Sequence, residues 1–366
     1  MKALILAGGF GTRLRPLSCT RPKMMFPIAN RPLLDWILED LSNKGVTKTV
    51  LAVNYMADVL KKNFGSSRYG MKIAYSYERK PLGTGGAIKK AERLLNDDDE
   101  PFFVLNGDIL SSIDYSKLYE THRELRSEAT IALHEVEDPS RFGVVELNGK
   151  DQILRFVEKP SREEAPSKFI NAGVYVLNHS TFDLITGEGK VSIEREVFPK
   201  LASKGSLYGY KFNGFWIDIG KPSDYLNANK LVLDEIAKEK AFLGRNVKVS
   251  SRATIIPPVA VGSNVTIADD ACIGPYSSIG DGVIIGKGTK IEESIVFSDV
   301  LIDNFTSIKG AIIGEGAVIG DWVKIEDQCI VGDHTLINDN VTLTQKVQVC
   351  PSKEVDTSIL QPSTIM

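Results

Sequence analysis

The sequence has few cysteines, and their spacing excludes two common kinds of small structural site. No two of them form a CxxC pair, and they are widely separated along the chain: Cys19, Cys272, Cys329 and Cys350. Disulfide frameworks are typical of small, cysteine-dense domains, and zinc sites commonly contain CxxC pairs. We therefore expect neither a disulfide-stabilised fold nor a zinc centre.

Histidine is also scarce, and no ligand-spaced cluster of it exists. The four histidines are scattered through the chain: His122, His134, His179 and His334. A histidine-based metal site is therefore not expected. The sequence also shows no Ser–His–Asp or Cys–His arrangement that would indicate a covalent nucleophile.

Long apolar runs and a strong charge of one sign are missing as well. No apolar run approaches the length of a membrane-spanning helix. Met1 and Lys2 lead directly into a short strand, with no cleavage signal after it. The net charge of −3 argues against a bulk nucleic-acid or membrane-surface binder, although it is compatible with a local basic pocket. We expect a cytoplasmic protein with no nucleic-acid or membrane partner.

Length and composition indicate a globular protein with more than one domain. The 366 residues exceed one typical domain, so two domains are expected. A hydrophobic content of 43% with 25% charged residues is ordinary for such a protein, so neither disorder nor a fibrous fold is indicated.

The N-terminal stretch combines an apolar run, a glycine-rich turn and several cations. The run at residues 3–7 has no polar alternation, as in a strand that is buried on both faces. Glycines allow close approach of a ligand to the backbone, and three follow the run: Gly8, Gly9 and Gly11. The cations come next: Arg13, Arg15, Arg21 and Lys23. This combination predicts a site for a polyphosphate anion.

This loop matches neither of two better-known phosphate motifs. The P-loop pattern GxxxxGK[ST] is absent, and Leu14 occupies the position where the dinucleotide fingerprint GxGxxG requires its third glycine. The loop therefore needs a different explanation.

Strands and helices alternate over the first hundred residues. Expected strands cover residues 3–7, 49–53, 72–77 and 102–105, and expected helices cover residues 33–41, 56–64 and 87–95. This alternation predicts an α/β domain with a Rossmann-like, mostly parallel sheet and helices on both faces. Ligands of such sheets bind at the carboxyl ends of the strands. The glycine loop, Gly83-Thr84 and Asp108 all fall at those ends.

Residues 128–178 are rich in β-branched residues and predict further strands. They contain two candidate site segments, residues 141–143 and 157–160, and residues 171–173 precede another apolar strand over 174–177. Ser192 is expected to cap a helix over residues 193–201. Residues 214–220 form a further candidate site segment, and a closing helix is expected from residue 222 to about residue 243. We therefore place the first domain at residues 1–243.

From about residue 245, aliphatic residues recur every six positions, with two five-residue steps. The fifteen positions are Val261, Ile267, Ile273, Ile279, Ile285, Ile291, Val296, Ile302, Ile308, Ile313, Ile319, Ile325, Val331, Ile337 and Leu343. This hexapeptide repeat predicts a left-handed parallel β-helix of about five coils over residues 244–349. Residues 350–366 are expected to form a tail or cap. A β-helix has flat faces and open ends, so a homo-oligomer formed through it is expected.

Several segments of the chain resemble the motifs of one known family. The run Leu6-Ala-Gly-Gly-Phe-Gly-Thr-Arg-Leu-Arg-Pro16 with Pro22-Lys23 resembles the signature of the sugar-1-phosphate nucleotidylyltransferases, or nucleotide-sugar pyrophosphorylases. The later family motifs follow in order: Asn106-Gly-Asp108, Phe156-Val-Glu-Lys-Pro160, Asn171-Ala-Gly173 and Trp216-Ile-Asp-Ile-Gly220. The resemblance covers residues 1–345, including the β-helix that many members carry.

The resemblance implies transfer of a nucleoside monophosphate from a nucleoside triphosphate to a sugar 1-phosphate, with release of pyrophosphate. Three segments most resemble the members that join GTP to mannose 1-phosphate to give GDP-mannose: residues 81–85, 192–199 and 214–216. In this reaction a phosphate oxygen of the sugar phosphate attacks the α-phosphorus in line. Positioning and charge neutralisation matter more than a covalent nucleophile.

Site residues are carried over from the family motif by motif. Arg13 would stabilise the leaving pyrophosphate, Lys23 would bridge phosphate oxygens, and Asp108 and Asp218 would hold Mg²⁺. The nucleotide-binding residues would be Leu6, Ala7, Gly8, Gly9, Gly11, Thr12, Arg13, Gly83 and Thr84. The sugar-phosphate-binding residues would be Gly143, Glu158, Lys159 and Asn171.

The chain departs from the family pattern after Lys23. Members usually continue with a proline or a small residue and then an aliphatic one, whereas Met24 and Met25 follow here, with Phe26-Pro27-Ile28 after them. Lys23 itself is intact, so the departure bears on local packing and substrate preference.

Three alternatives stay open. Thymidylyl- and uridylyltransferases that act on glucose 1-phosphate share most of these motifs. A bifunctional enzyme could carry an acetyltransferase in the β-helix, with His334 as its base. A non-catalytic regulatory subunit of the same fold is the third, and the intact set of Arg13, Lys23, Asp108 and Asp218 argues against it.

Overall fold

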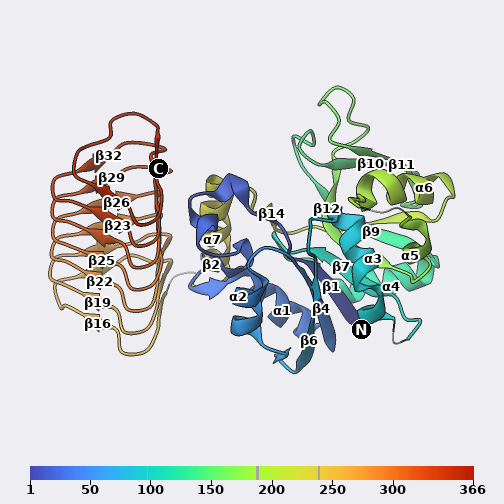
Figure 1. Cartoon of the computed structure of the whole chain (residues 1–366), viewed down its shortest axis with the longest axis horizontal. Coiled ribbons are helices and arrows are strands. Elements are labelled where there is room, and N and C mark those ends of the chain that lie inside the picture. Colours follow the sequence, from blue (N-terminus) through green and yellow to red (C-terminus); the bar gives the residue numbers. More distant parts are fainter. Residues whose placement is uncertain (97, 187–188, 238–239) are drawn as a thin grey trace. The chain divides into compact units, whose positions relative to one another are not determined.

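The computed structural model describes residues 1–96, 98–186, 189–237 and 240–366. The chain divides into two compact units (Figure 1). Unit 1 contains Met1–Gly9 and Leu34–Asp218, and unit 2 contains Phe10–Leu33 and Ile219–Met366. Residues 10–33, the signature segment, therefore group with the β-helix, whereas the sequence predicts one domain over residues 1–243.

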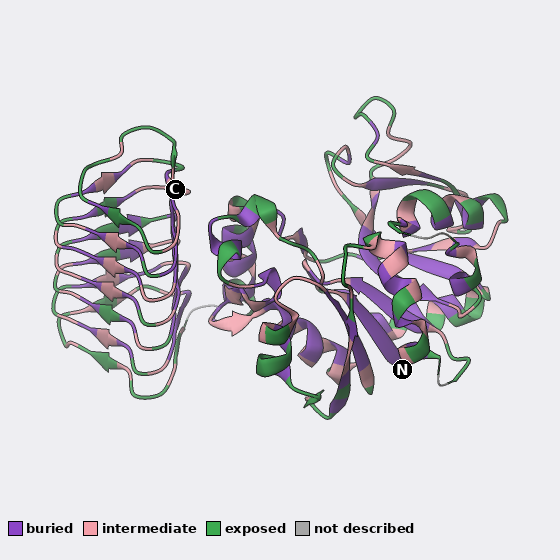
Figure 2. Ribbon diagram, in the orientation of Figure 1, coloured by how far each residue is buried: buried purple, intermediate pink, exposed green. Residues whose placement is uncertain are grey.

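Four parallel strands form the centre of the unit 1 sheet. In sheet order they are β7 (Phe102–Asn106), β1 (Lys2–Leu6), β4 (Lys48–Val53) and β6 (Met71–Tyr77). Nearly every residue of β1, β4 and β7 is buried, as Figure 2 shows in purple. Burial on both faces explains why these strands are continuous apolar runs rather than alternating ones.

The remaining strands make the sheet a mixed one of ten strands within the described residues. They are β5 (Ser67–Arg68), β9 (Ala129–Glu135), β10 (Gly143–Leu147), β11 (Ile153–Glu158), β12 (Phe169–Leu177) and β13 (Leu207–Lys211). β12 runs antiparallel to β7, so its first residues lie near the carboxyl end of β7. A separate antiparallel pair joins β8 (Ile109–Ser111) to β14 (Trp216–Asp218).

Most expected helices of unit 1 are present among the described residues, and two further short helices there were not expected. The helices are α1 (Leu33–Asn43), α2 (Ala57–Phe64), α3 (Gly83–Leu95), α4 (Tyr115–Leu125), α5 (Thr181–Leu184) and α6 (Phe198–Ser203). Ser192 caps a π-helical turn (Ile193–Val197) ahead of α6, and its hydroxyl accepts from the Arg195 amide at 3.3 Å. The unexpected α4 has its own cap, because the Asp114 carboxylate accepts from the Lys117 amide at 3.2 Å.

Unit 2 begins with the signature segment, which folds into short turns. It contains three 3₁₀ turns and a two-stranded pair: Thr12–Leu14, Leu17–Cys19, Lys23–Met25, and β2 (Pro27–Ile28) with β3 (Arg31–Pro32). Helix α7 covers Pro222–Ile236 and is shorter than the closing helix expected to reach residue 243. Residues 238–239 lie outside the described residues, and β15 (Ala241–Leu243) already pairs with the β-helix.

Three stacks of short parallel strands form the β-helix, consistent with a left-handed one (Figure 1). The first stack contains β15, β18 (Val259–Val261), β21 (Ser277–Ile279), β24 (Ile295–Val296), β27 (Ile312–Ile313), β30 (Ile330–Val331), β33 (Gln348–Val349) and β35 (Thr364–Ile365). The second contains β16 (Lys248–Val249), β19 (Thr266–Ile267), β22 (Ile284–Ile285), β25 (Leu301–Ile302), β28 (Val318–Ile319), β31 (Leu336–Ile337) and β34 (Glu354–Val355). The third contains β17 (Thr254–Ile255), β20 (Cys272–Ile273), β23 (Lys290–Glu292), β26 (Ser307–Lys309), β29 (Lys324–Ile325) and β32 (Thr342–Leu343).

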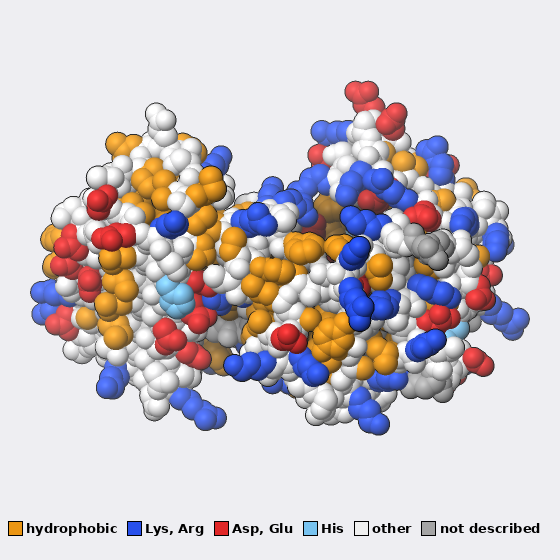
Figure 3. All heavy atoms as spheres, viewed as in Figure 1, with side chains coloured by type: hydrophobic (Ala, Val, Ile, Leu, Met, Phe, Trp, Pro, Cys, Tyr) orange, Lys and Arg blue, Asp and Glu red, His pale blue; other side chains and the backbone are white. Residues whose placement is uncertain are grey.

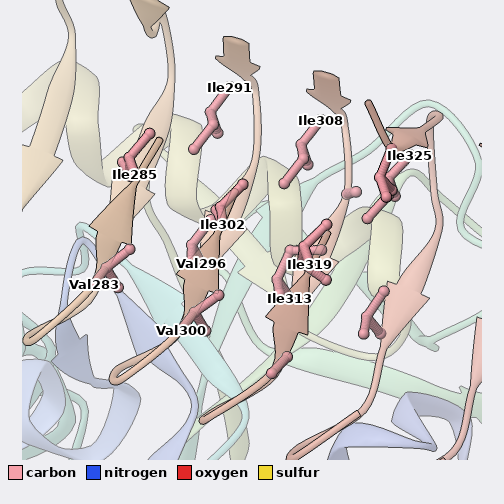
Figure 4. Close-up of a cluster of buried hydrophobic side chains, with 14 of the residues drawn as sticks. Val283, Ile285, Ile291, Val296, Val300, Ile302, Ile308, Ile313, Ile319 and Ile325 are labelled. Atoms are coloured by element: carbon pink, nitrogen blue, oxygen red, sulfur yellow. The ribbon is translucent and has the colours of Figure 1, made fainter. Parts of the chain in front are cut away.

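All fifteen aliphatic positions of the repeat are buried in one continuous core. Figure 4 shows part of this core, with Ile285, Ile302 and Ile319 labelled on successive strands of the second stack. A coil is 18 residues long where Val261 pairs with Ile279, and 17 residues long where Ile279 pairs with Val296. The two five-residue steps therefore shorten single coils without breaking the stack.

The stack is taller than the five coils expected, because strands extend it at both ends. Val249 pairs with Ile267 at one end, and β35 pairs with β33 at the other. The segment expected as a tail or cap thus supplies β34 and β35, and Val355 is buried in the core.

The core stacking predicts very different effects for two neighbouring isoleucines of β22. Ile285 is fully buried, whereas Ile284 is 49% exposed. Ile285→Ala should lower the free energy of unfolding of the β-helix by about 2–5 kcal/mol, because it leaves a cavity between coils. Ile284→Ala should change it by less than about 0.5 kcal/mol. Chemical denaturation followed by circular dichroism measures both, and equal effects would contradict the assigned register.

Candidate functional site

The nucleotide-binding residues expected first along the chain lie at the carboxyl end of β1. Leu6 ends that strand, and the Ala7 amide donates to the Ala52 carbonyl at 2.9 Å. A Cβ atom added at Gly8 would lie 3.4 Å from both Asn54 Cβ and Glu78 Oε1. A side chain at Gly8 would therefore contact the residues that follow β4 and β6, whereas one at Gly9 would contact nothing within 4 Å.

The loop continues in unit 2 with a left-handed glycine. Gly11 has φ +59°, a conformation that residues with a Cβ rarely adopt, and its carbonyl accepts from the Leu14 amide at 2.8 Å. The following turn leaves Thr12 and Arg13 exposed. The Ser18 hydroxyl also donates to the Gly11 carbonyl at 2.8 Å. The loop therefore presents Arg13 from a turn that is closed by its own hydrogen bonds.

Lys23 lies beside this loop although it is twelve residues away from Gly11 in the sequence. A Cβ atom added at Gly11 would lie 3.7 Å from Lys23 Cβ. Lys23 begins a 3₁₀ turn and is only 9% exposed, which is uncommon for a lysine. Met24, where the chain departs from the family pattern, is buried and packs internally.

Arg21 does not converge with the other cations of the loop, contrary to the expectation from the sequence. Its guanidinium contacts two carboxylates of the β-helix, Asp333 at 2.6 Å and Glu315 at 2.9 Å. A cation held by two carboxylates is already neutralised, so Arg21 is a structural residue rather than a phosphate ligand.

Gly83 and Thr84 begin α3, and close packing explains both residues. Gly83 has φ +73°, and a Cβ atom added there would lie 2.5 Å from the Val191 carbonyl oxygen. The Thr84 hydroxyl donates to Glu194 at 2.6 Å and accepts from the Ile193 amide at 3.0 Å. This hydroxyl therefore ties α3 to the turn before α6, which leaves the backbone at Gly83 as the candidate contact for a base.

Glu78 is a candidate site residue that the sequence analysis missed. It follows β6, and its Oε2 atom accepts from the Leu82 amide at 3.0 Å, directly before Gly83. Burial raises the pKa of its carboxyl, and the hydrogen bond from Leu82 opposes this shift in part. Only its position after an expected strand could have signalled it, since Glu78 belongs to none of the recognised motifs.

Asp108 and Asp218 come from distant parts of the sequence but from adjoining backbone. β8 begins at Ile109, directly after Asp108, and Ile109 is the pairing partner of Asp218 in β14. The antiparallel pair thus brings the two aspartates together at one end of the ribbon. The Trp216 indole fixes the same strand, because its N–H donates to the Ala172 carbonyl at 2.9 Å.

The expected sugar-phosphate residues form a row across β10, β11 and β12. Gly143 pairs with Glu158, and the next residue of β10, Val144, pairs with Ile170, which precedes Asn171. A Cβ atom added at Gly143 would lie 2.9 Å from Glu158 Oε2. A glycine is therefore needed for the Glu158 carboxylate to lie over this strand.

Lys159 and Asn171 differ in how firmly they are held. Lys159 has a left-handed backbone and is 60% exposed, with its ammonium 3.5 Å from Glu158. The Asn171 amide donates to the Tyr175 hydroxyl at 3.0 Å, and its oxygen accepts from the Gly173 amide at 2.8 Å. Burial raises the pKa of Tyr175 well above its ordinary value, so this phenol stays protonated. Asn171 is thus held by two hydrogen bonds, whereas Lys159 is largely exposed and contacts Glu158.

Two family models match the chain. One, described as nucleotidyl transferase, matches residues 2–235, and the other, described as the GMPPB C-terminal domain, matches residues 255–365. The chain belongs to the nucleotidyl transferase family. It is accordingly a nucleotidyltransferase, and its β-helix occupies the region that the second model matches.

Curated relatives of this nucleotidyltransferase align with part or all of its sequence. A probable mannose-1-phosphate guanylyltransferase 1 of rice (Oryza sativa subsp. japonica) is 38% identical over 371 residues, which cover 100% of both chains. A mannose-1-phosphate guanyltransferase of Yarrowia lipolytica is 46% identical over 244 residues, which cover 65% of this chain and 66% of that protein.

Solved structures of the family share the fold of the catalytic region. HddC from Yersinia pseudotuberculosis in complex with GMP-PN is 32% identical with a TM-score of 0.54, covering 63% of this chain and 99% of that one. A UDP-glucose pyrophosphorylase complexed with UDP-glucose is 25% identical with a TM-score of 0.57, covering 64% of this chain and 98% of that one.

Nucleotidyltransferases of this family use a divalent metal ion, and two carboxylates of this chain fit one. Hard divalent cations prefer oxygen ligands, and Asp108 and Asp218 supply them from adjoining strand ends. No group of three or more His, Cys, Asp or Glu side chains suited to a metal occurs among the described residues. No helix in that part of the chain is long and apolar enough to cross a membrane.

Proposed function

We propose that this nucleotidyltransferase transfers GMP from GTP to mannose 1-phosphate, which gives GDP-mannose and pyrophosphate. The observation that carries the proposal is the full-length match to a rice protein named as a probable mannose-1-phosphate guanylyltransferase. The chain also retains the residues that such a reaction needs: Arg13, Lys23, Asp108 and Asp218.

The reaction replaces one bond to the α-phosphorus of GTP by another. A phosphate oxygen of mannose 1-phosphate forms the new bond, and the bond to the pyrophosphate oxygen breaks in line with it. Arg13, exposed on its turn, would neutralise charge on the departing pyrophosphate. Lys23, a nearly buried residue, would contact phosphate oxygens with its ammonium group.

Asp108 and Asp218 would bind Mg²⁺, which takes its other ligands from phosphate oxygens and water. A bound Mg²⁺ supplies positive charge that polarises the phosphate being attacked. The two aspartates themselves contribute by holding fixed positions at the end of the β8–β14 ribbon.

The sugar phosphate would be bound by the row of residues on β10, β11 and β12. Glu158 would accept hydrogen bonds from sugar hydroxyls, with its orientation allowed by the absence of a side chain at Gly143. Lys159 would pair with the phosphate, which its exposed ammonium can reach from solvent. Asn171, fixed by Tyr175, would set the position of the ring.

Glu78 offers a physical reason for a preference for guanine. Guanine presents two adjacent donors, N1–H and the 2-amino group, which suit a carboxylate acceptor. Glu78 lies next to Gly8 and is linked through Leu82 to the start of α3 at Gly83. Other bases lack this donor pair, so a carboxylate here would select GTP.

Two expectations about the whole protein stay predictions. One is a cytoplasmic location, and the other is a homo-oligomer formed through the β-helix. The stacked rings of Phe305 and Trp322, with centroids 4.5 Å apart, favour self-association because they are 41% and 60% exposed. Figure 3 also shows hydrophobic side chains among the charged ones on the β-helix surface.

The proposed substrates predict a clear order in a matrix of purified protein, nucleoside triphosphates and sugar 1-phosphates. GTP with mannose 1-phosphate should release pyrophosphate fastest, with both GTP and MgCl₂ required. Equal rates with dTTP or UTP and glucose 1-phosphate would overturn the specificity. Consumption of acetyl-CoA with an amino-sugar phosphate would instead favour the bifunctional alternative, and no turnover with any pair would favour a regulatory subunit.

The proposed roles also predict the outcome of two alanine substitutions. Lys23→Ala and Asp218→Ala should each lower kcat by about 10²–10³-fold, since both remove charge stabilisation at the reacting phosphates. The matched controls are Lys117→Ala and Asp183→Ala, whose side chains are exposed on α4 and α5. Circular dichroism should show folded protein in all four. Near-wild-type rates for Lys23→Ala and Asp218→Ala would remove them from the mechanism.

Base selection by Glu78 predicts a change in specificity rather than a general loss of activity. Glu78→Gln should reduce the preference for GTP over ITP, which lacks the 2-amino group, by about tenfold, because a charge-assisted hydrogen bond is lost. Burial raises the pKa of Glu78, and only the carboxylate accepts from both donors. The KM for GTP should therefore fall as pH rises through that pKa in wild type alone. An unchanged preference, with Glu120→Gln as the surface control, would contradict this role.

A further inference from the structure

The β-helix has a recurring hydrogen bond at its turns, in which an Asp or Asn side chain of one coil accepts from a backbone amide of the preceding coil. Five such acceptors have bond lengths of 2.6–2.9 Å: Asp281, Asn304, Asp321, Asp333 and Asp339. In each case the Oδ1 atom is the acceptor. Since Asn304 performs this task with an amide, the coil contact itself does not need a carboxylate.

Asp333 differs from the others through its second oxygen. Its Oδ2 atom accepts from the Thr20 hydroxyl and from the Arg21 guanidinium, each at 2.6 Å. The Asp333 side chain is only 3% exposed, and the Arg21 guanidinium also contacts Glu315 and lies 4.8 Å from the centre of the Phe297 ring. A carboxylate this deeply buried is costly unless it is paired, so its charge serves the contact with Arg21.

The far end of the signature segment is held to the same unit by neutral groups. The Asn30 amide donates to the Ile279 carbonyl at 2.7 Å. The buried Asn229 oxygen of α7 accepts from the Ala29 amide at 2.9 Å and from the Ser278 hydroxyl at 2.8 Å. The segment is thus fixed to the β-helix on both sides of Lys23.

We propose that Asp333 is a positioning residue for the nucleotide-binding loop. It fixes Thr20 and Arg21, and Lys23 follows two residues later across Pro22. Ser18, which precedes Thr20, donates its hydroxyl to the Gly11 carbonyl. The position of Thr20 and Arg21 therefore also affects the loop that carries Arg13. The β-helix then contributes to catalysis by positioning Lys23 and Arg13. This inference rests on the proposed function only in its assumption that Lys23 and Arg13 act on the triphosphate.

Asp333→Asn tests this role, because it keeps the Oδ1 acceptor of the coil and replaces Oδ2 by an N–H donor facing Arg21. We expect kcat to fall about a hundredfold, the loss that a displacement of about 1 Å produces. The KM for mannose 1-phosphate should change less than about twofold, because the residues proposed to bind it lie in unit 1. Asp339→Asn makes the same substitution at another turn of the β-helix and should retain wild-type kinetics. A wild-type kcat in Asp333→Asn, or the same loss in Asp339→Asn, would overturn the proposal.

A second variant approaches the contact from the other side and does not disturb the β-helix core. Arg21→Met should lower kcat to a similar extent, and the double variant with Asp333→Asn should be no worse than the poorer single variant, since both break one interaction. If the fold-losses in kcat of the two single variants multiply in the double variant, the two residues act independently. That result would overturn the proposal, whatever the stability of Asp333→Asn.

Hydrogen exchange separates this inference from the proposed function. In Asp333→Asn the amides of residues 10–33 should exchange at least tenfold faster, while those of residues 330–350 keep wild-type protection. This measurement needs no turnover. An inactive wild type would therefore refute the proposed substrates alone, whereas unchanged exchange in residues 10–33 would refute the positioning role alone.

Discussion

Parallel pairing of β1 with β4 and β7 is the constraint on which the arrangement of unit 1 depends. Parallel strands in one sheet end at the same edge, so the residues that follow β1, β4, β6 and β7 lie on one side of the unit. Gly8, Glu78 and Asp108 all owe their placement to this pairing. The antiparallel strand β12 then places Asn171 near the same edge, because its first residues lie at the carboxyl end of β7.

Side-chain contacts, rather than strand pairing, hold the signature segment in unit 2. The signature segment has little secondary structure of its own, and its two hydrogen-bonded strands, β2 and β3, are two residues long each. Side-chain contacts hold it to the rest of unit 2, among them those of the buried Asp333 carboxylate with Thr20 and Arg21. The candidate site residues are therefore positioned differently in the two units. Backbone hydrogen bonds between strands position those of unit 1, and side-chain contacts to the β-helix position those of the signature segment.

Local patterns made the repeating parts of the molecule predictable. Burial of every sixth residue requires an aliphatic side chain there, so the positions from Val261 to Leu343 could be read directly, and all fifteen are buried. The same holds for the continuous apolar runs of β1 and β7. The ends of the stack were missed, although the six-residue spacing reaches them, through Ile255 to Val249 before Val261 and through Val349 to Val355 after Leu343. Helix α4 was missed, although Asp114 is a typical N-cap residue and Tyr115, Leu118, Tyr119 and His122 have helical spacing.

The sequence by itself determined the fold of each part, the family motifs and the residue types at the candidate site. Those features depend on local periodicity and on short runs of residues, which are present in the chain before it folds. Only the tertiary structure decided that Arg21 pairs with Asp333, that Thr84 bonds to Glu194, and that Asp218 meets the residue after Asp108. Each of these contacts joins residues more than a hundred positions apart, and no local pattern records which distant partner a side chain will have.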